Sequence, residues 1–95
     1  MIPSEKYSLR LYVTGLTPRS TRAITIVRAI CEEHLAGHYD LEIIDVYQMP
    51  HRISEDHVVA IPTLVKTRPP PMRLLVGDMS DRRRLLAGLG LPHDD

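Results

Sequence analysis

The stretch LRLYVTGLTPRS, residues 9–20, decides the fold of this chain. Apolar residues alternate with other residues from 9 to 13, and this period of two predicts a β-strand that ends before Gly15. Thr17 is a favourable N-cap, and Pro18 suits the first helical position because its missing N–H needs no partner there. The stretch therefore predicts a strand that turns directly into a helix.

A helix and a second strand are predicted next. Apolar residues recur at helical spacing, and Gly37 is a natural helix end. The recurring residues are Ile24, Val27, Ile30, Cys31 and Leu35. The segment 41–47, LEIIDVY, has apolar residues on both faces, as in a strand of a sheet that is covered on both sides. Strand, helix and strand in this order predict a parallel, right-handed βαβ unit.

The second half predicts a hairpin. Residues 61–66, IPTLVK, form a strand that opens with Pro62, because proline is tolerated at the first position of a strand. The run Pro69-Pro70-Pro71 predicts a stiff turn. The segment 73–76, RLLV, then returns as the second strand of the pair.

Two further helices are predicted, one on each side of the hairpin. The first lies within residues 49–60 and begins near Pro50. Its inner side is expected to carry Ile53, His57, Val58 and Ala60. The second covers 82–89, with Ser80 as its N-cap and Asp81 in its first turn, where the helix dipole favours an acid. The order β-α-β-α-β-β-α is that of a thioredoxin-like α/β domain, and 95 residues fit one domain spanning 1–95.

Composition bears on the class of partner. Lys+Arg and Asp+Glu both number 12, so the net charge does not favour nucleic-acid binding. A low net charge is compatible with self-association.

The expected location follows from segments that the sequence lacks and from its cysteine content. No apolar run approaches the ~18–20 residues of a membrane span. The N-terminal residues lack the apolar core of a signal peptide. One cysteine fits a reducing compartment, so a cytoplasmic protein is expected.

The sequence contains no recognisable set of catalytic residues. The turn 17–20, TPRS, lies where a thioredoxin carries its two thiols, yet it has no sulfur, and Cys31 is expected in the core. His34 and His38 share a spacing used by zinc ligands, but Gly37 separates them. The arginines 82–84 point in different directions and are expected on a solvated face. We therefore expect no enzyme, no metal and no cofactor.

The chain resembles the KaiB family over residues 7–91. The resemblance rests on short segments that are weak singly and specific in this order and spacing. They are Leu9-Arg10-Leu11-Tyr12-Val13-Thr14-Gly15, Thr17-Pro18-Arg19-Ser20, Ile44-Asp45-Val46, Pro62-Thr63-Leu64, Pro69-Pro70-Pro71 and Gly77-Asp78. The sensor domain of SasA-type histidine kinases is similar too, although a kinase follows it there.

The resemblance implies a non-enzymatic regulator that binds the ring of a KaiC-type ATPase in a circadian or timer system. In cyanobacteria the bound family member also sequesters KaiA and displaces SasA. The residues expected at the ATPase belong mainly to the segment 49–61, with two arginines from elsewhere. They are Arg22, Pro50, Arg52, Glu55, His57, Val58, Ile61 and Arg73. The alternative is a stand-alone thioredoxin-like sensor or adaptor module for another signalling or stress partner.

The resemblance also implies two folds. One is thioredoxin-like, monomeric and competent to bind, and the other is a resting fold with a rearranged C-terminal half that tends to form homotetramers. X–Pro bonds isomerise over tens of seconds or more, which gives this segment slow two-state elements, although a stiff hairpin loop is the simpler reading. The residues expected to set the equilibrium are Pro62, Pro69, Pro70, Pro71, Gly88 and Gly90.

Two departures from the family pattern refine these expectations. The segment 85–91, LLAGLGL, favours a helix over the strand that the resting fold requires, so the thioredoxin-like state is predicted to dominate. Glu42 and His57 stand where clock members often carry lysine. Glu42 lies on the strand expected to meet KaiA, so the change of charge argues against KaiA as a partner.

Overall fold

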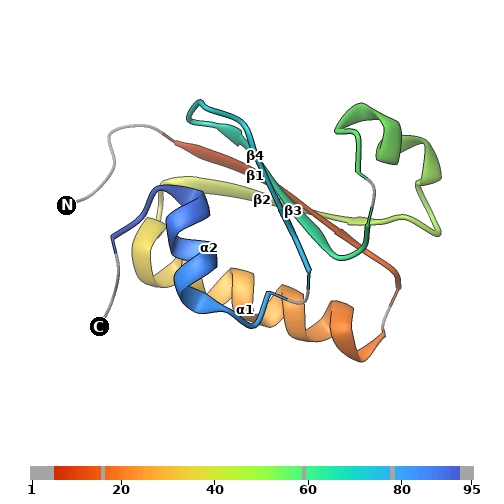
Figure 1. Ribbon diagram of the computed structural model, residues 1–95, viewed down its shortest axis with the longest axis horizontal. Coiled ribbons are helices and arrows are strands. Elements are labelled where there is room, and N and C mark those ends of the chain that lie inside the picture. The colour runs from red at the N-terminus through yellow and green to blue at the C-terminus, as the bar shows by residue number, and fades with distance from the viewer. Residues whose placement is uncertain (1–5, 16, 59, 78, 93–95) are drawn as a thin grey trace.

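A four-stranded sheet carries two α-helices on one face and a short 3₁₀ helix on the other (Figure 1). The computed structural model describes residues 6–15, 17–58, 60–77 and 79–92. The strand order is β2-β1-β3-β4, with β1 parallel to β2 and antiparallel to β3. Along the chain the elements are β1 (Tyr7–Val13), α1 (Pro18–Leu35), β2 (Tyr39–Asp45), η1 (Pro50–Glu55), β3 (Thr63–Arg68), β4 (Arg73–Val76) and α2 (Arg82–Leu89).

The first βαβ unit follows the prediction closely. The side chain of Thr17 caps α1 by accepting the backbone N–H of Ser20 at 3.3 Å, and the helix ends at Leu35. β2 begins and ends two residues earlier than predicted. Its end is set by Asp45, whose Oδ1 accepts the backbone N–H groups of Gly15 at 3.2 Å and Tyr47 at 2.9 Å. That carboxylate turns the chain out of the sheet before the predicted strand is complete.

Each face of the sheet has its own core. On the α-helical face, β1 and β3 pack against α1 and α2 through the cluster Leu9, Leu11, Val27, Ile30, Cys31, Leu35, Leu64, Leu85, Leu86 and Leu89. On the other face a smaller cluster lies beneath η1 and its flanks, formed by Tyr12, Ile44, Val46, Val58 and Val65. Only part of this second face is therefore covered. Within the described residues, no helix combines the length and apolarity needed to cross a membrane.

The predicted helix within 49–60 is a 3₁₀ helix that ends at Glu55, and its expected inner side was partly wrong. Val58 is buried as predicted, but His57 and Ala60 are exposed, and Asp56 is buried in their place. His57 has φ of 55°, which reverses the chain after the last turn and directs its ring outward. Asp56 is drawn inward by polar partners on β1.

The last helix covers the predicted residues, α2 (Arg82–Leu89), but its N-cap lies one residue later than predicted. Asp81, not Ser80, is its N-cap, and the Asp81 carboxylate accepts the backbone N–H of Arg84 at 3.1 Å. Gly90 ends α2 in the left-handed conformation with φ of 74°. The expected solvated arginine face was partly wrong, because Arg82 pairs with Glu33 of α1 and the Arg84 side chain donates to the carbonyl of Val76.

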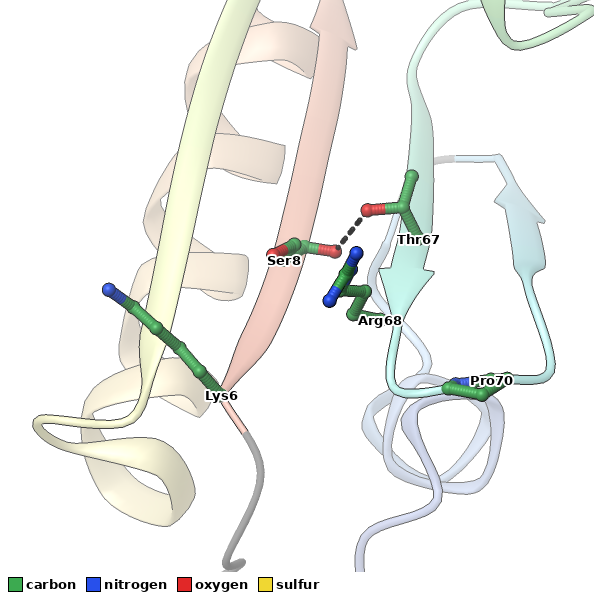
Figure 2. A pocket seen from close by; sticks show the side chains of 5 residues that line it. All are labelled: Lys6, Ser8, Thr67, Arg68 and Pro70. Atoms are coloured by element: carbon green, nitrogen blue, oxygen red, sulfur yellow. Dashed lines mark hydrogen bonds between the residues drawn. The ribbon is translucent and has the colours of Figure 1, made fainter.

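The β3–β4 hairpin forms as predicted, with Pro69–Pro71 in the turn. The predicted bounds of its first strand, 61–66, were wrong, because β3 runs from Thr63 to Arg68 and Pro62 lies buried just before it. The peptide bonds Ile61–Pro62, Arg68–Pro69 and Pro70–Pro71 are cis. The β1–β3 ladder contains a bulge, because Ser8 pairs with Arg68 whereas Leu9 pairs with Lys66. The extra residue, Thr67, donates its hydroxyl to the carbonyl of Ser8 at 3.1 Å (Figure 2).

Candidate partner-binding site

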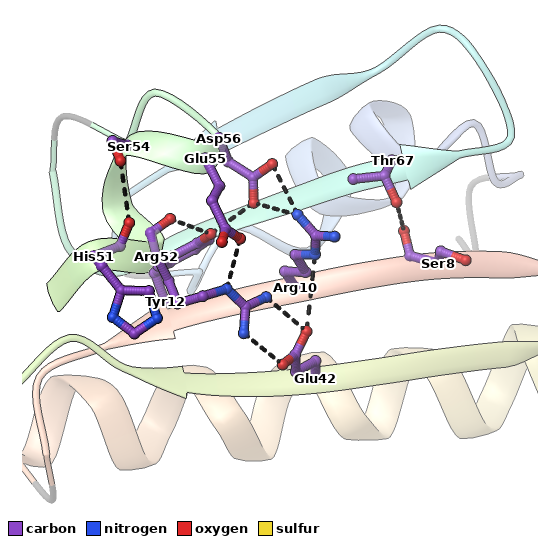
Figure 3. A network of polar contacts seen from close by, with 10 residues as sticks. All are labelled: Ser8, Arg10, Tyr12, Glu42, His51, Arg52, Ser54, Glu55, Asp56 and Thr67. Atoms are coloured by element: carbon purple, nitrogen blue, oxygen red, sulfur yellow. Dashed lines mark hydrogen bonds and ion pairs between the residues drawn. The ribbon is translucent and has the colours of Figure 1, made fainter. Parts of the chain in front are cut away.

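A network of polar side chains fastens η1 to the sheet (Figure 3). At its centre is Asp56, the residue after η1, which is only 4 % exposed. Its carboxylate accepts hydrogen bonds from Nη1 of Arg10 at 3.0 and 3.1 Å and from the hydroxyl of Tyr12 at 2.6 Å. Arg10 and Tyr12 lie two positions apart on β1 and therefore point to the same face of the sheet. A buried charge is thus matched by one cation and one neutral donor.

Tyr12 is the deepest member of this network. Its side chain is fully buried, and its hydroxyl lies 2.6 Å from Asp56 Oδ2 and 2.9 Å from the carbonyl of Arg52. The single phenolic proton serves one of these acceptors at a time, and the carboxylate is the stronger. Burial, reinforced by the hydrogen bond to Asp56, raises the pKa of Tyr12 to about 12. Tyr12 therefore stays a neutral donor at every physiological pH.

An outer tier of charges links η1 to β2. Arg52 grips Glu42 with two parallel hydrogen bonds of 2.9 and 3.0 Å and pairs with Glu55 at 2.6 Å. Arg10 approaches Glu42 as well, at 3.8 Å. The hydrogen bond to Glu42 raises the pKa of Arg52, and the same bond lowers the pKa of Glu42. The short helix is thereby held to β1 through Asp56 and to β2 through Arg52.

We expect the Glu42 pair to make part of the stability dependent on acid. The Arg52 guanidinium holds the pKa of Glu42 below its ordinary value of 4.5. A depressed folded-state pKa gives a contribution that is complete above that value and is lost as the pH falls through the folded-state pKa. The contribution is below about 1 kcal/mol, because Glu42 is 48 % exposed and its charge is screened.

Urea unfolding of wild type and Glu42→Gln at neutral pH and at about pH 3 measures this contribution. Glu42→Gln should be the less stable protein at neutral pH, and the gap should close in acid and in high salt. A gap of equal size at both pH values would mean that the Glu42 charge contributes nothing.

The structure brings together six of the eight residues predicted to meet a partner. All six belong to η1 or its flanks, but only some remain available at the surface. Pro50 and His57 are exposed and Ile61 is partly exposed, whereas Val58 belongs to the core beneath η1. The remaining two, Arg52 and Glu55, already bind one another.

The other two predicted contact residues lie elsewhere. Arg22 is exposed on α1, which covers the opposite face of the sheet. Arg73 lies opposite Lys66 in the β3–β4 ladder, at the turn end of the hairpin. The chain that arrives from η1 enters β3 at the other end, at Thr63. A partner that touched all eight residues would therefore have to extend around the molecule.

Sequence reasoning missed the inner part of the network. The alternation of β1 placed Arg10 and Tyr12 on one face, but nothing in the sequence indicated that Asp56 would join them. The segment around Asp56 is read as helical, and an acid in a short helix is ordinarily solvent-facing. The available signal was weak, because an arginine in the first strand is compatible with an acidic partner but does not indicate which acid supplies it.

Cys31 lies in the core, as predicted. Its side chain is fully buried in the middle of α1, and burial raises the pKa of its thiol to about 11. In the described part of the chain, no three His, Cys, Asp or Glu side chains are grouped so that they could hold a metal ion. The turn from β1 into α1 carries hydroxyl groups instead of sulfur, with Ser20 accepting the backbone N–H of Thr14 at 3.0 Å.

Known proteins of similar sequence and fold agree with these observations. The family model described as "KaiB domain" matches residues 10–91. The circadian clock oscillator protein KaiB of Prochlorococcus marinus is 47 % identical over 95 residues, covering 100 % of this chain and 80 % of that protein. Its counterpart from Parasynechococcus marenigrum is also 47 % identical over 95 residues, covering 100 % and 91 %.

Solved structures support the thioredoxin-like fold. The N-terminal domain of SasA from Synechococcus elongatus matches with a TM-score of 0.73 at 24 % identity, covering 100 % of this chain and 93 % of that domain. Mitochondrial thioredoxin 3 from Saccharomyces cerevisiae matches with a TM-score of 0.72 at 14 % identity, covering 92 % and 79 %. With a family model over most of its residues and relatives matched along its whole length, this chain belongs to the KaiB family.

Proposed function

We propose that the chain is a non-enzymatic clock or timer regulator that binds the ring of a KaiC-type ATPase mainly through the surface of η1 and its flanks, with Arg22 and Arg73 as contacts outside that surface. The observation that carries the proposal is a short helix that begins at exposed Pro50 and is followed by exposed His57, fastened to a thioredoxin-like sheet in a member of the KaiB family. Its relatives are named as circadian clock oscillator proteins.

Rigidity is what makes the η1 surface suitable for binding. A 3₁₀ helix of six residues has few hydrogen bonds of its own, and on its own it would not hold one conformation. Here it is fixed from below by Asp56 and from the side by Arg52. A surface already ordered before contact loses less conformational entropy on binding.

We infer that binding is gated by a fold equilibrium that favours the thioredoxin-like state in this chain. Several contacts stabilise α2 as a helix: the Asp81 cap, the Gly90 end, and the hydroxyl of Tyr7, which donates to the carbonyl of Leu89 at 2.8 Å. In the resting fold, a homotetramer, these contacts would be lost. Pro62, Pro69–Pro71, Gly88 and Gly90 are the residues proposed to set the balance.

Amide NMR of the free protein tests the equilibrium. Helical chemical shifts across residues 82–89 with the relaxation of a monomer are expected. Strand-like shifts there, with relaxation of a tetramer, would show that the resting fold dominates and that the argument from α2 is wrong.

Two further partners are considered, KaiA and a SasA-type kinase, and KaiA is the less favoured of the two. Glu42 lies on β2, the edge strand that KaiA would meet. Its carboxylate is already engaged by Arg52 and Arg10, so it is not available to a partner without breaking those pairs.

Binding to a purified KaiC-type ring tests the proposed function. We expect Arg22→Glu and His57→Glu each to weaken binding about tenfold or more, since each places an acid at a proposed contact. Arg28→Glu is the matched control, because Arg28 is also exposed on α1 but lies six residues further along, on another side of the helix. Undetectable binding of the wild type, or equal losses in all three variants, would favour the adaptor function with a different partner.

A further inference from the structure

The half of the sheet that η1 leaves uncovered is hollowed along β1 and β3 (Figure 2). The hollow, here called the β1–β3 trough, has a volume of about 690 Å³ and is lined by Lys6, Ser8, Thr67, Arg68 and Pro70. A second depression of about 500 Å³ continues toward β2 and shares Ser8, Thr67 and Arg68 with it. The trough therefore crosses the strands instead of forming an enclosed cavity.

The bulge at Thr67 gives the trough its basic character. In regular alternation Val65 and Thr67 would face the η1 side of the sheet, and Arg68 would face the α-helices. The extra residue in β3 breaks this alternation, so that Arg68 lines the trough together with Thr67. Figure 2 shows the Arg68 guanidinium extending over the strands toward Ser8.

The charges of the trough are not balanced by the protein itself. Arg68 is exposed and has no acidic partner among the residues that the structure describes. Lys6 pairs with Asp40 at 3.2 Å, but both side chains are more than 60 % exposed, so water weakens the pair. No acid lines the trough itself, but Asp40 and Glu42 line its continuation toward β2, so the basic part of the surface is the end at Arg68. Two cations flanking two hydroxyl groups form a surface complementary to carboxylates.

The shape of the trough favours a chain over a small molecule. A pocket for a small ligand encloses most of its surface. The trough is open along its length and continues across neighbouring strands toward β2. An extended peptide can lie along such a surface with an acid at Arg68.

We propose that the β1–β3 trough binds an extended acidic segment of a partner protein, with a carboxylate at Arg68. The site is separate from the η1 surface, so a partner held here would leave that surface free. This proposal does not depend on the ATPase, and its test uses no ATPase.

Titration of the ¹⁵N-labelled protein with a hexaglutamate peptide tests the proposal. Amide signals of Ser8, Thr67 and Arg68 should shift, and the binding should weaken as salt rises. Arg68→Gln should lower the affinity about threefold to fivefold, as expected for an exposed charge pair. Arg19→Gln, which removes the same charge at the exposed start of α1, should leave the affinity unchanged.

Three results would overturn the proposal. Signals that move on α1 instead of β1 and β3 would place the peptide elsewhere. An equal loss in Arg68→Gln and Arg19→Gln would reduce the effect to net charge. Inorganic phosphate that displaces the peptide at equal concentration would identify a site for free anions, not for a peptide.

Discussion

Replacing Asp56 with alanine is expected to lower the free energy of unfolding by about 2–4 kcal/mol, the range for breaking a buried ionic and hydrogen-bonded group. The change removes the acceptor of Arg10 and of the Tyr12 hydroxyl at once. Tyr12 is fully buried and keeps only the carbonyl of Arg52. Arg10 is about one third exposed and can recover part of its hydration, which keeps the loss below the largest values for such pairs.

Urea unfolding of four proteins measures this effect. Asp40→Ala is the matched control, because Asp40 is an exposed acid on the same face of the sheet and, among the described residues, forms an ion pair with exposed Lys6 alone. It should change the stability by no more than about 0.5 kcal/mol. Asp56→Asn should fall between the two, since its amide oxygen still accepts from Tyr12 but carries no charge for Arg10. A loss below about 1 kcal/mol in Asp56→Ala would show that the network contributes little.

The location of the loss matters as much as its size. If Asp56 fixes η1, amide exchange in residues 50–58 of Asp56→Ala should accelerate more than exchange in α1. Binding to a KaiC-type ring should weaken in parallel, because the η1 surface would then have to be ordered during binding. A destabilised variant with a protected η1 would separate stability from preorganisation and would contradict the role given to Asp56.

The sequence carried enough information for the order of the elements but not for this network. Regular alternation in β1 and the Thr17-Pro18 signal at α1 depend on neighbours along the chain, and the structure confirms both. Asp56 and Arg10 are 46 positions apart. Their pairing depends on how η1 is laid across the sheet, and local patterns do not encode that placement.

The N-cap of α2 and the end of β2 were both predicted at the wrong residue. Ser80 and Asp81 are both good N-caps, and either could begin α2. The structure uses Asp81, whose carboxylate reaches the N–H of Arg84. At the end of β2, the side chain of Asp45 bonds the backbone of Gly15 and Tyr47 and ends a strand that its apolar sequence would have continued.

Glycine in α2 shows how a local reading can miss a packing role. By propensity, Gly88 weakens a helix by about 1 kcal/mol relative to alanine, and a position near the helix end makes that tolerable. In the structure Gly88 lies against Leu75 of β4. A Cβ at this position would stand 2.8 Å from Cδ1 of Leu75 and closer still to Cδ2. The missing side chain is therefore what allows α2 to approach the sheet.

Replacing Gly88 with valine is accordingly expected to destabilise the thioredoxin-like state by about 2–3 kcal/mol, toward the upper end for overpacked cores. Leu75 is 8 % exposed and has little room to turn away. Ala87→Val, at the exposed neighbouring position, is the control for the helix propensity of valine alone and should cost well under about 1 kcal/mol.

Leu75→Ala supplies the decisive comparison for Gly88→Val. Alone, Leu75→Ala should cost about 2–5 kcal/mol by leaving a cavity, but a valine at 88 would fill part of that space. The double variant should therefore be more stable than the sum of the two single losses predicts, by about 1 kcal/mol or more. Additive losses, or a Gly88→Val protein as stable as Ala87→Val, would mean that α2 moves away from β4 without penalty. Gly88 would then act through the flexibility of the chain instead of through close packing. Its proposed effect on the fold equilibrium would have to come from the resting fold, not from packing in the thioredoxin-like state.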